Sequence, residues 1–300
     1  MAWIAVALAS AAVSGGLTII DKQTLSKYMP SMGSFGLVLA VIQASWSLIA
    51  LVFHPLSGDV ALSYYAITLL SGCFWGLALI VYYFVLIKEE ASRVSPVFHT
   101  YPAIVAVLGV TLLSESLSSL QWLAVMVTIA GAMLISARKS AGRAFSINRK
   151  SFAILMLAST LAAFGQLTSK YALDNVAFWD VFIVRNLGIA LPFFIYLSKD
   201  SIKGFYQSLK TPAGFLYIIG GELVWGGLTV LIALVAVNMG PISIISAILG
   251  TRPVFVFLYT SVLSTNKLHA MDEPITRDVL FSKGIAIAMV VAGVAALSLL

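Results

Sequence analysis

The sequence predicts an all-α membrane protein with ten transmembrane helices, arranged as two inverted five-helix repeats. Its composition is the first reason: 60% of the 300 residues are hydrophobic and 10% are charged, with a mean hydropathy of +1.01, whereas soluble domains carry about 25% charged residues. The second is that apolar runs of about 20 residues, long enough for a helix to cross a hydrocarbon core, occur ten times. The third is that landmarks of the first half recur in the second.

Short polar connectors separate the ten apolar runs. Connectors as tight as 238–240 force antiparallel hairpins, and only 137–151 and 264–283 are long enough for a linker or a surface helix. Met1-Ala2-Trp3 opens the first run without a positive n-region, which favours a retained span over a signal peptide. The runs expected to span the membrane cover residues 3–20, 33–53, 63–87, 94–113, 120–136, 152–169, 181–197, 212–237, 241–263 and 284–300.

The recurring landmarks lie at matching depths of the two halves. They are Leu8-Ala9-Ser10 with Leu157-Ala158-Ser159, Trp75-Gly76 with Trp225-Gly226, Thr100-Tyr101-Pro102 with Thr251-Arg252-Pro253, and Ile129-Ala130-Gly131 with Val291-Ala292-Gly293. Each half holds an odd number of spans, so the second copy must enter the bilayer upside down. We therefore expect a first repeat at 1–136, a basic linker at 137–151 and a second repeat at 152–300. Inverted repeats are a mark of alternating-access transporters, whose ligand site lies between the halves.

The positive residues indicate membrane orientation rather than a nucleic-acid partner. Fifteen of the 18 Lys and Arg residues lie in the odd-numbered connectors, and by the positive-inside rule these connectors are cytoplasmic. Both termini are then expected outside, and the compact connectors favour a bacterial inner membrane. Cys73 is the one cysteine, so no intrachain disulfide and no cysteine-based metal cluster can form. No cofactor is expected, and the expected partners are a small-molecule substrate and membrane lipid, with the chain a monomer or a homodimer.

Arg185 and Arg252 fall inside predicted spans. A guanidinium at the centre of a membrane helix costs roughly 2.5–3.5 kcal/mol on insertion scales, so both need partners or water. Arg252 precedes Pro253 halfway along its span, where the proline loosens the helix around the charge. We expect Arg252 to line the substrate path, with a buried structural ion pair as the alternative. Arg185 aligns with Gln43 of the first half and is expected to make a polar contact between the halves.

Glu222 and His99 are the candidates for proton coupling. Glu222 lies about ten residues from the nearer end of its span, and a carboxyl group in a low dielectric can exchange its proton as access changes. A fixed counter-ion to Arg185 or Arg252 is an equally weighted reading. A titrating His99 would suit a proton-linked exporter, although a hydrogen-bonded core histidine is the commoner case. Glu115 and Lys22 are expected to be solvated helix ends.

Aromatic side chains near these charges are candidates for the walls of a cavity. Trp75 and Trp225 occupy matching positions of the two halves, Tyr82 and Tyr83 follow about two turns after Trp75, and Tyr101 stands beside Pro102. Packing or an interfacial anchor is the alternative for each. The chain shows no paired-histidine metal spacing, no phosphate-binding Gly-rich loop and no Gly-x-Ser-x-Gly turn, so we do not expect an enzyme.

The pattern resembles the EamA-like branch of the drug/metabolite transporter superfamily. The matching residues are Gly15-Gly16 through Lys22, Ser95-Pro96 through Pro102 to Glu115, Gly131, Gly240-Pro241, Arg252-Pro253 and Gly293. This resemblance implies a ten-helix transporter. Proteins similar in this way export amino acids, drugs or other metabolites. We expect export of a small zwitterionic or anionic, amino-acid-like metabolite, with proton coupling. The alternatives are an organic-anion, nucleotide-sugar or sugar-phosphate exchanger and, from another class, a channel or a noncatalytic scaffold.

Overall fold

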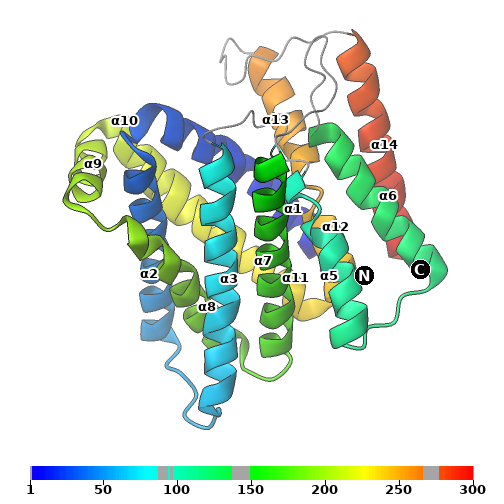
Figure 1. Ribbon diagram of the computed structural model, residues 1–300, viewed down its shortest axis with the longest axis horizontal. Helices are drawn as coiled ribbons and strands as arrows, with labels where there is room; N and C mark the ends of the chain where they lie inside the picture. The colour runs from blue at the N-terminus through cyan, green and yellow to red at the C-terminus, as the bar shows by residue number, and fades with distance from the viewer. Residues whose placement is uncertain (1, 87–93, 95–96, 137–148, 266–276, 300) are drawn as a thin grey trace.

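The computed structural model describes the whole chain except residues 1, 87–93, 95–96, 137–148, 266–276 and 300, and the elements it describes are all helices (Figure 1). Seven helical segments are long and apolar enough to cross a membrane, judged by length and composition, and three shorter apolar helices match the remaining predicted spans. The membrane-helix character is thus confirmed, while the number of ten spans stays a prediction. The seven are Ala2–Tyr28, Met32–Phe53, Leu62–Leu86, Arg149–Leu173, Phe178–Tyr196, Pro212–Met239 and Ile242–Thr260, and the three are Tyr101–Leu112, Ser119–Leu134 and Gly284–Leu297.

The first half runs through five apolar helices. The sequence sets their ends locally: the Ser31 hydroxyl accepts a hydrogen bond from Ser34 N at 3.1 Å and so caps the second helix. Their bounds are α1 Ala2–Gln23, which continues as the π-helical turn η1 Thr24–Tyr28, then α2 Met32–Phe53, α3 Leu62–Leu86, α5 Tyr101–Leu112 and α6 Ser119–Ser136.

The second half repeats this order with one addition. Its helices are α7 Arg149–Leu173, α8 Phe178–Phe193 with the 3₁₀ turn η2 Phe194–Tyr196, α9 Lys199–Lys210, α10 Pro212–Phe215 with the π-helix η3 Leu216–Gly226 and α11 Gly227–Met239, α12 Ile242–Leu249, α13 Arg252–Thr265 and α14 Arg277–Leu299. Of the predicted linker 137–151, residues 149–151 belong to α7 and the others lie outside the described residues.

The fourth and ninth predicted spans are interrupted at equivalent positions. Each break carries a threonine whose hydroxyl donates to the carbonyl three residues back: Thr100 to Val97 O at 2.8 Å and Thr251 to Ile248 O at 2.7 Å. The helix that follows begins at Tyr101 or Arg252, with proline as its second residue, where the missing N–H costs no hydrogen bond. The expected loosening of the helix at Arg252 is confirmed, and the fourth predicted span, 94–113, is broken at the equivalent position.

The connector between the seventh and eighth spans contains a helix that we did not predict. α9 occupies Lys199–Lys210, and the Ser198 hydroxyl caps it by accepting from Ser201 N at 3.1 Å. Ser201, Gly204 and Ser208 form its buried face. The expectation that only 137–151 and 264–283 could hold a surface helix was therefore wrong, because small residues rather than large apolar ones make the buried face of α9.

The two halves pack through reciprocal contacts. α1 meets the η3–α11 segment where a Cβ on Gly16 would lie 3.1 Å from the Trp225 ring, and α7 meets α3 where a Cβ on Gly165 would lie 3.1 Å from Trp75 N. α6 and α14 pack through Gly131 and Gly293, where a Cβ on either glycine would lie 2.9 Å from a backbone oxygen of the other helix. Residues at equivalent positions of the two halves thus make equivalent contacts with the opposite half.

Candidate functional site

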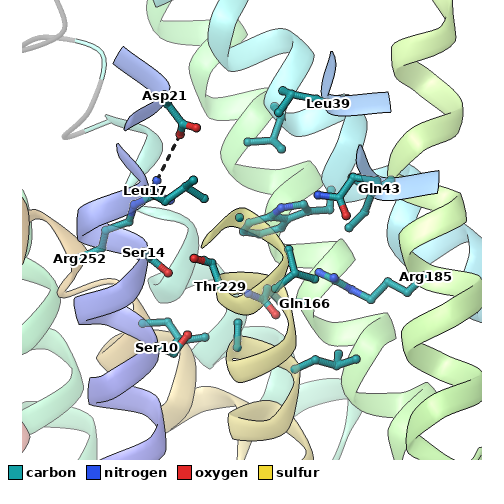
Figure 2. A pocket seen from close by; sticks show the side chains of 18 of the residues that line it. Ser10, Ser14, Leu17, Asp21, Leu39, Gln43, Gln166, Arg185, Thr229 and Arg252 are labelled. Atoms are coloured by element: carbon teal, nitrogen blue, oxygen red, sulfur yellow. Dashed lines mark ion pairs between the residues drawn. The ribbon is translucent and has the colours of Figure 1, made fainter. Parts of the chain in front are cut away.

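A cavity of about 170 Å³ lies between the two halves (Figure 2). Both halves contribute: α1, α2 and α3 from the first, and α7, α8, η3 and α11 from the second, together with the two broken spans. Six of the eight predicted site residues line this cavity, namely Trp75, His99, Tyr101, Arg185, Glu222 and Arg252. The interruptions before Tyr101 and Arg252 therefore both lie at its wall.

Arg252 occupies one side of the cavity, held by α1. Its Nε donates to Thr18 Oγ1 at 2.5 Å, and its Nη2 lies 3.8 Å from Asp21 Oδ2. The Thr18 hydroxyl in turn donates to Ser14 O at 3.0 Å, which fixes its acceptor lone pair towards the guanidinium. Because the side chain of Arg252 keeps 33% of its surface exposed and that of Asp21 keeps 17%, this ion pair borders the cavity and combines both expected roles of Arg252.

Glu222 lies next to this pair in η3. It is 2% exposed, and its Oε1 has no hydrogen-bond partner among the described residues. Its carboxyl group interacts with that of Asp21, and the helices approach closely here, since a Cβ on Gly221 would lie 2.5 Å from Ile20. Within the described residues Glu222 forms no ion pair with an arginine. Asp21 occupies the counter-ion position that was one of the two readings of Glu222.

Arg185 occupies the other side of the cavity, on α8, across Gln166 and Thr229 from Arg252 in the view of Figure 2. Its Nε donates to Ser169 Oγ at 2.8 Å, and its guanidinium carbon lies 6.0 Å from the centre of the Trp75 ring. The expected contact between the halves is therefore a cation–π interaction. No carboxylate of the described residues pairs with Arg185, which is 6% exposed, so an anionic group in the cavity would find an unneutralised cation here.

The aromatic wall differs in part from the prediction. Tyr101 packs edge-on against Trp75 with ring centres 5.9 Å apart, and His99 lines the cavity beside Phe98. Of the two predicted tyrosines of α3, Tyr83 lines the cavity and Tyr82 does not; the Tyr82 ring packs at a tilt of 46° against Phe98, with ring centres 4.6 Å apart. The two residues are adjacent on α3, and the rotation of about 100° per residue around the helix axis points their side chains in different directions.

Trp225 lies outside the lining of this cavity. Its side chain is 41% exposed, and its indole Nε1 donates to Val13 O on α1 at 2.8 Å. The repeat-equivalent Trp75 faces the cavity, so equal position in the repeat does not give the two indoles equal surroundings. The structure places Trp225 as packing between α1 and η3, which was the alternative reading.

Asp21 is the charged residue of the cavity lining that the sequence analysis did not predict. The first span was predicted to end at residue 20, whereas α1 runs to Gln23 and continues into η1. This extra turn carries Asp21 into the cavity lining. The signal was present, because Thr18 and Asp21 lie three residues apart on one helix face.

Glu115 is a helix cap and not the solvated helix end that we expected. Its carboxylate accepts from Ile242 N at 2.6 Å, from Ser243 N at 3.0 Å and from the Ser243 hydroxyl. Ser114, with φ of 57°, turns the chain after α5 towards this contact. A carboxylate at a helix N-terminus satisfies free N–H groups and complements the helix dipole, so Glu115 ties the first half to the broken ninth span.

Comparison with known proteins supports a transporter architecture. No curated protein matches the chain. A solved structure titled "Crystal structure of protein" aligns with 99% of this chain and 96% of its own chain, with a TM-score of 0.74 at 13% sequence identity; likeness at this identity establishes the fold alone. Residues 1–137 match the model of the EamA-like transporter family. This match agrees with the resemblance seen in the sequence, and together with the apolar helices it supports an integral membrane protein.

Proposed function

We propose that this protein is a secondary active transporter that exports a small zwitterionic, amino-acid-like metabolite by alternating access. Its two five-helix repeats would have inverted topology, with both termini outside a bacterial inner membrane. The reciprocal packing of Gly16 with Trp225 and of Gly165 with Trp75 supports the repeat, and the Lys and Arg bias supports the orientation. Rocking of the halves around a central site is how such folds alternate access.

The observation that carries this proposal is the separation of charges across one cavity. On one side Arg185 has no carboxylate partner among the described residues, while on the other Arg252 pairs with Asp21 and the carboxyl group of Glu222 lies beside that of Asp21 without an arginine partner of its own. A substrate with a carboxylate and an ammonium group complements both sides at once. A phosphate clamp would need both arginines free for bidentate contacts, and Arg252 is already engaged by Asp21 and Thr18.

Proton coupling would reside in the carboxyl groups of Asp21 and Glu222. These two carboxyl groups interact with each other and only Asp21 pairs with a guanidinium, so with both ionised the cluster of Asp21, Glu222 and Arg252 carries one negative charge in excess. Burying an uncompensated charge is costly, and either a proton or the substrate's ammonium group can supply the missing positive charge. Competition between these two occupants would couple outward substrate movement to inward proton movement. His99 lines the same cavity and is the second candidate for proton transfer.

Counterflow in proteoliposomes tests the proposal. The full-length protein is offered a labelled panel of amino acids, nucleotide sugars and sugar phosphates, and we expect saturable exchange of an amino acid. Arg185→Gln should abolish exchange of carboxylate substrates, while Glu222→Gln should retain exchange and lose its response to a pH gradient. Lys170→Gln is the matched control, because Lys170 pairs with Asp174 at 2.9 Å and lies outside the cavity lining.

Each other outcome points to another function. Exchange confined to sugar phosphates or nucleotide sugars would replace the proposal with an anion exchanger, and flux that does not saturate would indicate a channel. Complete lack of substrate-dependent flux would indicate a scaffold. Amino-acid exchange that survives neutralisation of both Arg185 and Arg252 would refute the assignment of the carboxylate site.

A further inference from the structure

The outer face of α9 carries a row of positive charge. Lys199, Lys203 and Lys210 are all exposed, and their spacing of four and seven residues places them on one stripe of the helix. Asp200 is the one acidic residue of α9, and it lies about 100° around the helix from Lys199. The opposite face is fixed to the bundle, where the Ser208 hydroxyl donates to Tyr28 O at 2.6 Å.

Apolar and aromatic groups flank this stripe on one side. Tyr206 is 60% exposed and Ile202 is 49% exposed, and the ammonium group of Lys210 lies 4.5 Å from the centre of the Tyr206 ring. Tyrosine and lysine side chains of this kind gather where hydrocarbon meets headgroups, with the apolar parts inward and the charges outward. A helix with a lysine stripe and an apolar flank is typical of segments that lie in the membrane interface.

The chain on either side of α9 locates the edge of the bilayer. Ile195 and Leu197 precede the helix and are 78% and 58% exposed, and Leu216, which follows it, is 66% exposed. These apolar side chains end the seventh predicted span and begin the eighth, so α9 lies at the level where the chain leaves the hydrocarbon. Figure 1 shows α9 beside α10 at the periphery of the bundle.

We propose that α9 is a binding site for anionic phospholipid, with the headgroup phosphates held by Lys199, Lys203 and Lys210 and the acyl chains lying along Ile202 and Tyr206. Each lysine near an anionic surface strengthens binding about fivefold at low salt. Three lysines give an upper limit of about a hundredfold preference for phosphatidylglycerol over phosphatidylcholine.

Native mass spectrometry of the full-length protein tests this site. The purified protein is offered phosphatidylglycerol and phosphatidylcholine at equal concentration, and we expect preferential retention of phosphatidylglycerol that falls with added salt. The triple variant Lys199→Gln, Lys203→Gln, Lys210→Gln should lose most of this preference. The triple Lys→Arg variant should keep it, as should Lys170→Gln, whose lysine lies near the opposite end of the bundle beside Asp174. The melting temperature without added lipid checks that every variant folds.

Three results would overturn the proposal. The wild-type protein could retain both lipids equally, or the triple Gln variant could keep the full preference for phosphatidylglycerol. Competition by glycerol phosphate as strong as that by the intact lipid would show that α9 recognises a soluble anion and not a membrane lipid. If the triple Gln variant fails to fold, loss of the preference in the single variants Lys199→Gln and Lys203→Gln decides the question.

Discussion

Replacing Gly72 with alanine should push α8 away from α3 and displace Arg185. A Cβ at this position would lie 2.1 Å from Arg185 O and 2.7 Å from Ile189 N, whereas ordinary contact begins at 3.4 Å. The helices must therefore separate by about 1.3 Å, the difference between 3.4 and 2.1 Å. Both opposing atoms belong to the backbone of α8 and cannot rotate aside. In the same crossing a Cβ on Gly188 would lie 2.2 Å from Leu69 O.

Overpacking of this kind costs about 1–3 kcal/mol. At roughly 2–4 °C per kcal/mol, the melting temperature of the purified protein should fall by about 2–12 °C. Carboxylate-substrate exchange should fall with it, because the backbone that carries Arg185 is the part displaced. Gly284→Ala is the control, since a Cβ there would meet nothing within 4 Å. Equal melting temperatures for Gly72→Ala and Gly284→Ala would refute the reasoning.

Three further substitutions test contacts outside the cavity. Glu115→Ala should cost about 1–3 kcal/mol of stability, since it leaves Ile242 N and Ser243 N without their acceptor, while Glu115→Gln should cost less; thermal unfolding of the two variants gives the comparison. Asp180→Ala and Tyr65→Phe should lower the melting temperature by matching amounts, because the Asp180 carboxylate accepts from Tyr65 Oη at 2.8 Å and from Ser57 N at 3.1 Å. A double-mutant cycle should show the two effects to be non-additive. Trp225→Phe should lose about 1 kcal/mol of stability, because the hydrogen bond to Val13 O is removed, and it should leave substrate affinity in counterflow unchanged. A large change in affinity would show that Trp225 contacts substrate.

The sequence was sufficient to predict the apolar helices and to single out three of the charged residues that line the cavity. Arg185, Arg252 and Glu222 stand out because a charge inside an apolar run is expensive, and that cost is visible without coordinates. The threonine–proline breaks were equally accessible, because proline has the same effect on any helix. These predictions depend on local chemistry alone.

Predictions that depended on the exact end of a helix or on a partner from another helix were less successful. Asp21 was missed because one additional turn of α1 decides whether the residue is buried. Glu115 looked like a helix end because its partners, Ile242 and Ser243, are more than 120 residues away. α9 escaped notice since its packing face consists of serine and glycine, which carry little hydropathy signal.

The site itself arises where the repeat is not symmetrical. Trp75 and Trp225 align the third and eighth spans, so Gly72 corresponds to Glu222, and the alignment of Gln43 with Arg185 makes Trp46 correspond to Gly188. One crossing between the halves, that of α3 with α8, is a close backbone contact at Gly72 and Gly188.

The equivalent crossing, that of η3 with α2, carries Glu222 and Trp46. The indole of Trp46 lies over Gly227, 1.9 Å from where a Cβ would be, and its Nε1 donates to Leu223 O at 2.7 Å. A tryptophan ring in place of a hydrogen atom holds α2 away from the backbone of η3, and the carboxyl group of Glu222 faces the space that results. Glu222 and Trp46, at positions that hold glycine in the equivalent crossing, thus account for both the opening of the cavity on this side and its acidic lining.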